Sequence, residues 1–383
     1  MMTSRERFRL ALEHKEADRV PIDVGGDMHN GVHDVAYRNL LEFLGERDEI
    51  CYYDRIQHLA ALKESVYERL HSDTRYLFAN APEGFEIRVE QDSSWHDEWG
   101  VKRINAGLYD EAVEAPLAEC TMEKIKKYRI PDAADPSRFS GLREKAQNLY
   151  DTTDYAVIGG NAASLFYLPS EIVGYQEFME KIALETKMME ALIDRILEWQ
   201  IDFFGGYLDA IGEFIEMIWM GDDWGTQIAP LMSPGMFRDI FVKRYREFTA
   251  FVKKRANVKV ALHSCGAVYW ALEAFAEAGI DVVHPVQGDA EGLRDPYLLK
   301  KEFGNALVFY SNLRNQTVLP YGTVEEVERD VKLKIDALAP GGGYIMSGGH
   351  NIQADVPPEN ILAMIDTTLK YGAYPIKGGP KKL

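Results

Sequence analysis

Apolar segments of strand length alternate with longer amphipathic segments along the chain after Pro131. The strand-like runs cover 155–159, 214–220, 258–262, 280–283, 306–310 and 343–346. The predicted helices cover 184–208, 234–256, 268–278, 296–303 and 324–338. Repeated strand–helix units of this length predict a parallel sheet with right-handed crossovers, because a helix is the usual connection between parallel strands.

The N-terminal third supplies the remaining strands of such a sheet. Residues 19–24 have the pattern of a strand, and one more is expected within 76–87, which brings the total to about eight. Eight parallel strands, each followed by a helix, are typical of a closed (β/α)8 barrel of the TIM type. An open doubly wound sheet is the alternative. The chain has no G-x-G-x-x-G opening a helix and no Walker sequence, so nucleotide binding has no support.

Residues 30–130 depart from this simple alternation. After a short predicted helix over 4–13, helices are expected over 33–44 and 54–70, and residues 76–117 have an irregular, β-like pattern. We predict a hairpin-bearing excursion there rather than a separate domain. The expected organisation is therefore one distorted (β/α)8 barrel domain over residues 1–383, with helical and hairpin insertions between residues 30 and 130.

The composition limits the possible partners. The formal net charge is −18, which argues against nucleic acid or an anionic membrane, since either needs a cationic face. Three cysteines are too few for a disulfide framework and indicate a reducing compartment; Cys51 and Cys120 are expected to be structural. The N-terminus lacks the apolar core of a signal peptide, and no apolar run approaches the roughly 20 residues of a membrane span. We expect a cytoplasmic protein.

His263 and Cys265 follow directly on the apolar run 258–262, which has the pattern of a buried parallel strand. Side chains two residues apart on a strand point the same way, and parallel α/β sheets carry their active groups at the carboxyl ends of strands. Gly266 then permits a tight turn. Imidazole and thiol together favour a metal site, with zinc as the first choice. A buried free cysteine beside a hydrogen-bonded core histidine is the structural alternative.

Further polar side chains follow the other predicted strands. In a barrel they converge on one mouth, where barrel active sites lie. The set comprises Asp23, Asp27, His29, Asn161, Asp222, Asp223, His284, Gln287, Tyr310, Asn312 and His350. Those expected to bind substrate are Asp23, Asn161, His284, Gln287, Tyr310 and Asn312, although His284 has the pocket wall as an alternative partner.

Three members of this set, Asp222, Asp223 and His350, are candidates for catalysis. One carboxylate of the aspartate pair could orient a ligating histidine or bind a polar group of the substrate. A helix cap and a solvated carboxylate are the alternative roles for the pair. His350 is the expected third metal ligand, which leaves one zinc position open for substrate. Its alternative roles are general acid/base and substrate contact.

Several motifs together resemble the uroporphyrinogen decarboxylase superfamily. They occur in order along nearly the whole chain and imply a distorted (β/α)8 barrel with its site at the carboxyl mouth. The motifs are Arg5-Glu6-Arg7-Phe8, Arg19-Val20-Pro21, the segment 222–227, Ser233-Pro234, His263-Ser264-Cys265-Gly266, the segment 319–327 and the segment 357–361.

The resemblance offers two chemistries. Haem-pathway decarboxylases carry an R-Q-A-G-R sequence soon after the first strand, where this chain has Asp23-Val24-Gly25-Gly26-Asp27. Carboxylates there would repel a tetrapyrrole that itself carries many carboxylates. The other branch contains cobalamin-dependent methyltransferases, in which the resemblance implies zinc held by His263 and Cys265. Many of these enzymes take their third ligand from a cysteine in the last loop, where this chain has His350.

A second departure lies at 310–314, where relatives commonly have a glycine-rich sequence ending in Asp. The resemblance implies a zinc-dependent methyltransferase that moves a methyl group between a small molecule, for example a methyl ether, and a corrinoid protein. The methylcobalamin or related corrinoid is expected on a separate partner, because the chain has no Asp-x-His-x-x-Gly sequence. A decarboxylase of another carboxylated substrate, or a non-catalytic corrinoid- or tetrapyrrole-binding protein, is the alternative. A monomer or homodimer is expected.

Overall fold

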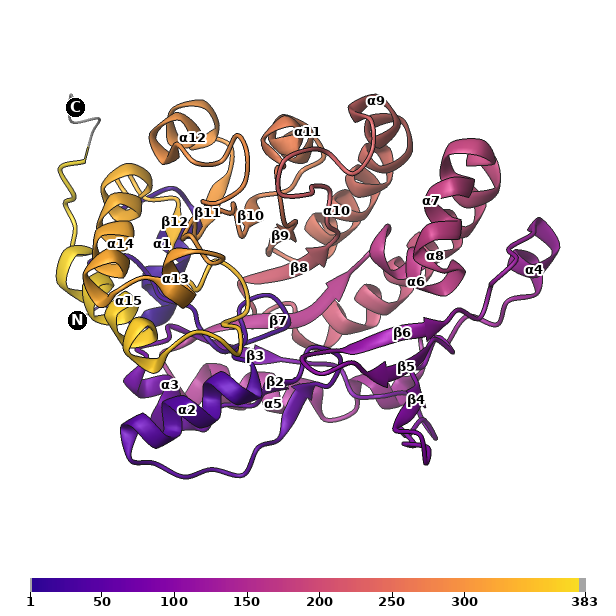
Figure 1. Cartoon of the computed structure of the whole chain (residues 1–383), viewed down its shortest axis with the longest axis horizontal. Helices are drawn as coiled ribbons and strands as arrows, with labels where there is room; N and C mark the ends of the chain where they lie inside the picture. Colours follow the sequence, from indigo (N-terminus) through magenta and orange to yellow (C-terminus); the bar gives the residue numbers. More distant parts are fainter. Residues whose placement is uncertain (1, 379–383) are drawn as a thin grey trace.

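A seven-stranded parallel sheet forms the centre of the computed structural model, which describes residues 2–378 (Figure 1). Its strand order is β12-β11-β10-β9-β8-β7-β3, and each neighbouring pair is parallel. The strands are β3 (Thr74–Leu77), β7 (Ala156–Ala163), β8 (Met217–Gly221), β9 (Lys259–His263), β10 (Val282–His284), β11 (Val308–Tyr310) and β12 (Tyr344–Ile345). Six of the seven lie within or beside the predicted runs, and β3 begins two residues before the region expected for it.

The segment 19–24 closes the ring between β12 and β3. On one side the amide of Asp23 donates to the carbonyl of Met346 over 2.9 Å, and on the other the amide of Asp73 donates to the carbonyl of Ile22 over 2.7 Å. A regular ladder cannot form, because Pro21 has no amide hydrogen and the amide of Ile22 is taken by the Asp73 carboxylate. The predicted (β/α) barrel is therefore confirmed, with an irregular eighth segment.

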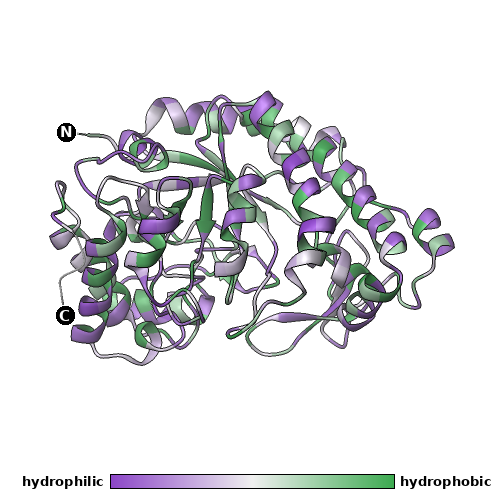
Figure 2. Cartoon of the chain, turned by 90° about the horizontal axis from the view of Figure 1, so that it is seen from above, coloured by the Kyte–Doolittle hydropathy of each residue, from purple (hydrophilic) through white to green (hydrophobic). Residues whose placement is uncertain are grey.

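Helices surround this sheet, and apolar residues gather in the central strands and along parts of the helices (Figure 2). The main barrel helices are α5 (Leu142–Thr152), α8 (Thr186–Ile211), α10 (Lys243–Arg255), α11 (Leu272–Glu277), α12 (Pro296–Phe303), α14 (Val324–Leu338) and α15 (Pro358–Tyr371). The other helices are α2 (Asp34–Leu44), α3 (Glu64–Arg69), α4 (Met122–Lys127), α6 (Tyr167–Val173), α7 (Tyr175–Leu184), α9 (Pro234–Phe237) and α13 (Val318–Tyr321). No helix in the described part of the chain is both long and apolar enough to span a membrane.

The helix α1 (Ser4–Leu12) packs into one end of the barrel. Its side chains Phe8, Ala11 and Leu12 join an interior cluster with Ile158 and Met217 from the strands, and all of them are buried. Because α1 contributes to the interior of the barrel beside β7 and β12, the barrel is a packed core rather than a channel. The polar loops that follow the carboxyl ends of the strands therefore remain as the place for a site.

The predicted helix over 54–70 is only partly present. The strands β1 (Tyr52–Asp54) and β2 (Leu59–Ala60) pair antiparallel, and the helix α3 begins only at Glu64. The amide of Ala60 donates to the carbonyl of Val32, so backbone pairing with a distant segment overrides the helical spacing of the apolar residues. The prediction of a continuous helix there was wrong.

The predicted hairpin excursion is a three-stranded antiparallel sheet. Its strands are β4 (Ser94–His96), β5 (Lys102–Asn105) and β6 (Asp110–Glu114). The amide of Asp110 donates to the carbonyl of Ile56, which ties this sheet to the β1–β2 hairpin. Both insertions therefore pack together, in agreement with the expected excursion between residues 30 and 130.

Candidate metal centre

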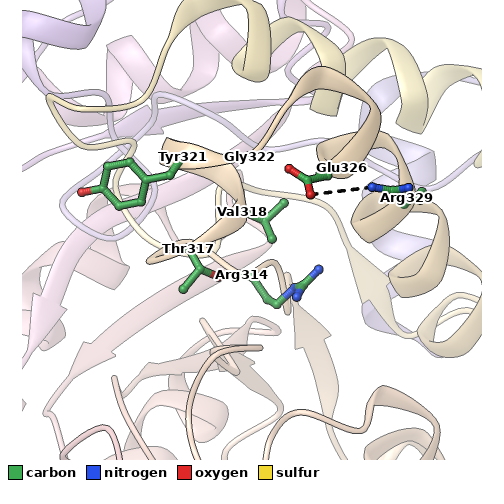
Figure 3. A pocket seen from close by; sticks show the side chains of 7 residues that line it. All are labelled: Arg314, Thr317, Val318, Tyr321, Gly322, Glu326 and Arg329. Atoms are coloured by element: carbon green, nitrogen blue, oxygen red, sulfur yellow. Dashed lines mark ion pairs between the residues drawn. The ribbon is translucent and has the colours of Figure 1, made fainter.

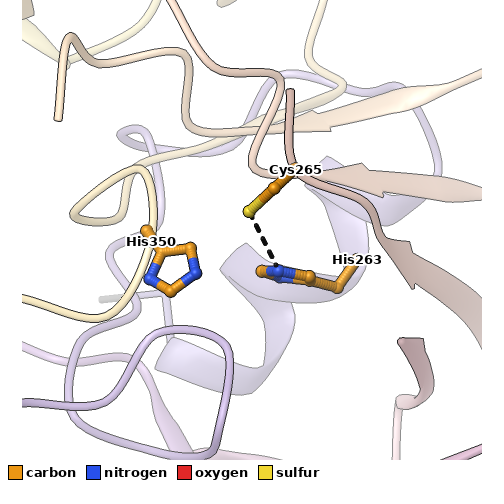
Figure 4. A group of neighbouring side chains, drawn as sticks. All are labelled: His263, Cys265 and His350. Atoms are coloured by element: carbon orange, nitrogen blue, oxygen red, sulfur yellow. Dashed lines mark hydrogen bonds between the residues drawn. The ribbon is translucent and has the colours of Figure 1, made fainter. Parts of the chain in front are cut away.

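Three side chains that the sequence proposes as metal ligands lie close together at the carboxyl ends of the strands. His263 is the last residue of β9, Cys265 follows two positions later, and His350 lies in the loop after β12 (Figure 4). One potential ligand atom from each residue lies within 4.8 Å of the others. The Nε2 atom of His263 and the Sγ atom of Cys265 are 3.3 Å apart.

The turn after β9 holds Cys265 in this position. Gly266 has a φ of +84°, and a Cβ atom there would lie 2.2 Å from the carbonyl oxygen of Gly225. The amide of Ala267 donates to the carbonyl of Thr226 over 2.7 Å, and the amide of Cys265 donates to Asp223 Oδ1 over 2.7 Å. Only glycine fits at 266, because any side chain would separate the two loops.

Two more imidazoles surround His263. His29 lies with its ring centroid 4.7 Å from that of His263 and stacks on Trp219 at 4.5 Å. His284 lies 5.0 Å away on the neighbouring strand β10, and its Nδ1 is 2.9 Å from Nδ1 of His263. The Nδ1 atom of His29 is 2.9 Å from Asp27 Oδ2, so this carboxylate orients the ring. Four histidines thus gather around one thiol.

Burial sets the protonation of this cluster. It lowers the pKa of His263 and His284 well below the ordinary value, and it lowers the pKa of His350 to about 4. Burial also raises the pKa of the Cys265 thiol, and the Asp223 carboxylate raises it further. At pH 7 the three imidazoles are neutral and hold lone pairs available to a metal ion, while the thiol must lose its proton to bind one.

The donor set fits zinc. Zinc–nitrogen and zinc–sulfur bonds at a tetrahedral angle place the two donor atoms about 3.5 Å apart, close to the 3.3 Å between His263 Nε2 and Cys265 Sγ. His350 lies within 4.8 Å, so small side-chain movements are enough to complete a three-ligand set. Two imidazoles and one thiol would leave a fourth position open, as catalytic zinc sites do.

Asp222 and Asp223 differ in their surroundings. The Asp222 carboxylate is buried and accepts hydrogen bonds from Ser164 Oγ, from Tyr245 Oη and from the amides of residues 165, 166 and 167, all at 2.7–2.9 Å. These contacts hold the loop before α6 and lend no support to the catalytic role predicted for Asp222. Asp223 Oδ1 lies 3.7 Å from His263 Nε2, and its side chain is 42% exposed. It can therefore act on the cluster.

Asp23 and Tyr310 lie together inside the barrel. The Asp23 carboxylate is fully buried and accepts hydrogen bonds from Thr74 Oγ1 at 2.5 Å, from Asn30 Nδ2 at 2.7 Å and from the hydroxyls of Tyr76 and Tyr310. Burial raises the pKa of Asp23 to about 6. These hydrogen bonds consume the polar atoms of Asp23, so its predicted contact with substrate gains no support from the structure.

The remaining predicted substrate contacts face the protein. Asn161 Oδ1 accepts from the amide of Ala79 at 2.8 Å, and Gln287 Oε1 accepts from the amide of Gly266 at 2.6 Å. Asn312 Nδ2 donates to the carbonyls of Val286 and Leu293 at 2.6 and 3.1 Å. These side chains brace the loops that carry the cluster, and their substrate-binding roles stay predictions.

The sequence places His29 among the polar side chains expected at the barrel mouth, but without a specific role. The signal was present in Asp27-Met28-His29, where a carboxylate precedes an imidazole by two residues, but its orientation toward His263 depends on the closure of the barrel. His29 Nδ1 is committed to Asp27, which leaves Nε2 as the atom able to exchange a proton.

A second group of potential ligands, His33, Asp34 and His58, also lies within 4.8 Å. The ring nitrogens of His33 contact the carbonyl of Leu108 at 3.0 Å and the amide of Val35 at 3.2 Å, where His33 caps α2. His58 Nε2 contacts Asp110 Oδ1 at 2.9 Å. Because both rings already serve the fold, the cluster around Cys265 is the stronger candidate.

A pocket of about 290 Å³ lies beside α13 and the start of α14 (Figure 3). Its lining includes Arg314, Tyr321, Glu326 and Arg329, and none of the predicted site residues. The Arg314 guanidinium is held by Asp330 at 3.1 Å. This pocket is therefore separate from the cluster around Cys265.

Comparison with known proteins identifies the family to which this chain belongs. The family model described as "Uroporphyrinogen decarboxylase (URO-D)" matches residues 110–371. The chain belongs to the URO-D family. Proteins named uroporphyrinogen decarboxylase from Pseudoalteromonas atlantica and Shewanella pealeana are 23% and 25% identical to this URO-D family member, over 72% and 69% of this chain and 76% and 73% of theirs.

The URO-D family fold also occurs in a solved structure described as a methyltransferase from Methanosarcina mazei. It has a TM-score of 0.67 and 18% sequence identity, and the similarity covers 97% of this chain and 99% of the other. At this identity the similarity shows a shared fold, which agrees with the resemblance drawn from the sequence motifs.

Proposed function

We propose that this URO-D family member is a zinc-dependent methyltransferase that moves a methyl group between a small molecule and a corrinoid protein. The observation that carries the proposal is the convergence of His263, Cys265 and His350 within 4.8 Å at the carboxyl ends of the strands. A soft thiol with two neutral imidazoles is a donor set suited to zinc. The fold itself is compatible, because a protein described as a methyltransferase shares it.

A bound zinc ion would supply Lewis acidity, either lowering the pKa of a coordinated thiol or hydroxyl acceptor or polarising the heteroatom of a methyl donor. The chain's own residues then bind and orient. Asp223 Oδ1 accepts from the amide of Cys265 and so fixes the turn that carries the thiol, and it lies 3.7 Å from His263 Nε2. His284 fixes His263 from the opposite side.

Removing a methyl group from an ether or amine leaves a heteroatom that must gain a proton, and the reverse reaction must release one. His29 is placed for this transfer, because Asp27 occupies its Nδ1 and its ring lies against that of His263. We assign the acid/base role to His29, with His350 as the alternative if it does not bind the metal.

The corrinoid is proposed to arrive on a separate protein. The sequence contains no cobalamin-ligand motif of its own, and the cluster lies at the end of the barrel opposite α1.

The proposed single-domain organisation, cytoplasmic location and monomeric or dimeric state stay predictions.

Decarboxylation of a carboxylated substrate is the second candidate, favoured by the names of the relatives. The segment 23–27 carries two buried carboxylates, Asp23 and Asp27, and none of the arginines that the resemblance gives to porphyrinogen decarboxylases there. Carboxylates at this position do not pair with an anionic substrate. A non-catalytic corrinoid- or tetrapyrrole-binding protein on the same barrel is the third candidate.

Zinc content and methyl transfer together test the proposal. Protein purified without chelator should contain about one zinc ion per chain. It should demethylate methylcobalamin in the presence of a panel of small thiols, or methylate cob(I)alamin from a panel of methyl ethers and methylamines, as followed by the corrinoid absorption spectrum. Metal-free protein that decarboxylates a carboxylated substrate would instead favour the second candidate. Corrinoid binding without turnover of any panel member would favour the third.

A further inference from the structure

His284 and His263 occupy matching positions on adjacent parallel strands. The register pairs His284 of β10 with His263 of β9, so both side chains point into the barrel side by side. Their Nδ1 atoms are 2.9 Å apart, which is hydrogen-bonding distance. A hydrogen bond between two nitrogens requires one to carry the proton and the other a lone pair.

The position of Cys265 decides the direction of this bond. His263 presents Nε2 to the thiol at 3.3 Å, so a metal ion shared with Cys265 would bind His263 through Nε2. A neutral imidazole that binds metal through Nε2 carries its hydrogen on Nδ1. His263 Nδ1–H therefore donates, and His284 Nδ1 accepts.

The surroundings of His284 lend no support to a direct contact with substrate. The residue is fully buried, and its Nε2 has no hydrogen-bond partner among the described residues. The rings of Trp219 and Tyr310 meet it edge to face at 5.5 and 5.4 Å. Its one side-chain hydrogen bond is the bond to His263, which differs from the substrate-binding role expected from the sequence.

We propose that His284 is a positioning residue of the metal centre, whose Nδ1 accepts a hydrogen bond from His263 and thereby presents His263 Nε2 to zinc. This inference rests on the proposed zinc-dependent function. It assigns to His284 the task that outer-shell carboxylates and carbonyls perform at other metal sites, namely fixing the tautomer and the orientation of a ligating imidazole.

Zinc affinity in three single variants tests the inference. His284→Leu removes the acceptor, whereas His284→Asn places an amide oxygen near the position of Nδ1. Trp219→Phe is the matched control, because it changes the packing around His284 without removing the acceptor. Zinc dissociation constants are measured by competition with a chromophoric chelator, and the absorption spectrum of the cobalt(II)-substituted protein reports the ligand geometry.

We expect His284→Leu to weaken zinc binding by about 10- to 100-fold and to alter the cobalt(II) spectrum. His284→Asn and Trp219→Phe should retain affinity and spectrum close to those of the unaltered protein. Equal affinity in His284→Leu and the unaltered protein would overturn the inference, as would equal weakening by the Leu and Asn substitutions, since that indicates packing alone. If the unaltered protein binds no zinc, the proposed function itself fails.

Discussion

The amide of Cys265 donates a 2.7 Å hydrogen bond to Oδ1 of Asp223, whereas the carboxylate of the adjacent Asp222 accepts its hydrogen bonds from residues 164–167 and from Tyr245. Asp223 reaches across from the loop after β8 to the loop after β9, where Cys265 of the proposed metal centre lies. Asp222 turns the other way and holds the segment before α6. Two neighbouring aspartates thus serve the site and the fold separately.

Asp222→Ala is expected to lower the free energy of unfolding by about 3–5 kcal/mol, because it leaves several buried donors without an acceptor. Asp223→Ala is expected to cost only about 1 kcal/mol, since one hydrogen bond is lost at a half-exposed position. Among the variants that fold, Asp223→Ala should weaken zinc binding more than Asp222→Ala does. Urea denaturation and chelator competition measure the two quantities. A strong loss of stability only in Asp223→Ala would contradict this division.

Cys265→Ala is expected to abolish stoichiometric zinc binding, because it removes the only thiol among the three proposed ligands. Cys120→Ala is the matched control: this thiol is buried, whereas Cys265 is half-buried, and Cys120 belongs to neither group of potential metal ligands. Elemental analysis of both variants after purification without chelator makes the comparison. Full zinc occupancy in Cys265→Ala would refute the metal centre as described.

Zinc binding is expected to tighten as the pH rises from 6 to 8. The raised pKa of Cys265 means that the thiol is protonated in the metal-free protein and must release one proton on binding. The lowered pKa values of His263 and His350 mean that the imidazoles release none in this range. Loss of one proton makes the dissociation constant fall roughly tenfold per pH unit. Titrations at several pH values measure this slope, and a pH-independent constant would show that zinc binding does not displace the thiol proton of Cys265.

Asp23 is expected to make the fold less stable at neutral than at mildly acid pH. Its pKa is about 6 in the folded protein and about 4 when unfolded, so the fold binds the proton more tightly between these values. The protonated carboxyl adds about 3 kcal/mol to the free energy of unfolding below about pH 4. This contribution is lost as the pH rises through 6. Urea denaturation of the unaltered protein and of Asp23→Asn at pH 4 and pH 7 isolates this contribution.

Between pH 4 and pH 7 the free energy of unfolding of the Asp23→Asn variant should rise by about 3 kcal/mol relative to that of the unaltered protein, because the amide cannot ionise. A constant difference between the two proteins would show that Asp23 does not titrate in this range, and that the tyrosine and threonine hydroxyls around it keep it charged throughout.

Local signals in the sequence were enough to predict several elements residue for residue. The helices α12 and α14 begin and end where expected, since Asp295 caps the first and Thr323 with Glu326 forms a capping box at the second. The pair His263 and Cys265 was equally local, because a strand and the turn that follows place both side chains by themselves.

The partners of these residues were a matter of tertiary structure. Helical spacing at 54–70 was overridden by pairing with residues 32–34, and Asp222 was committed to donors from residues 164–167. His284 met His263 only because β10 lies in register beside β9. Periodicity and caps act within a few residues, so the amino-acid sequence alone determined the strand–helix order and the H-x-C turn. Which carboxylates and imidazoles lie beside the proposed metal ligands was decided by barrel closure, since hydrogen bonds between distant loops form only when the strands are assembled.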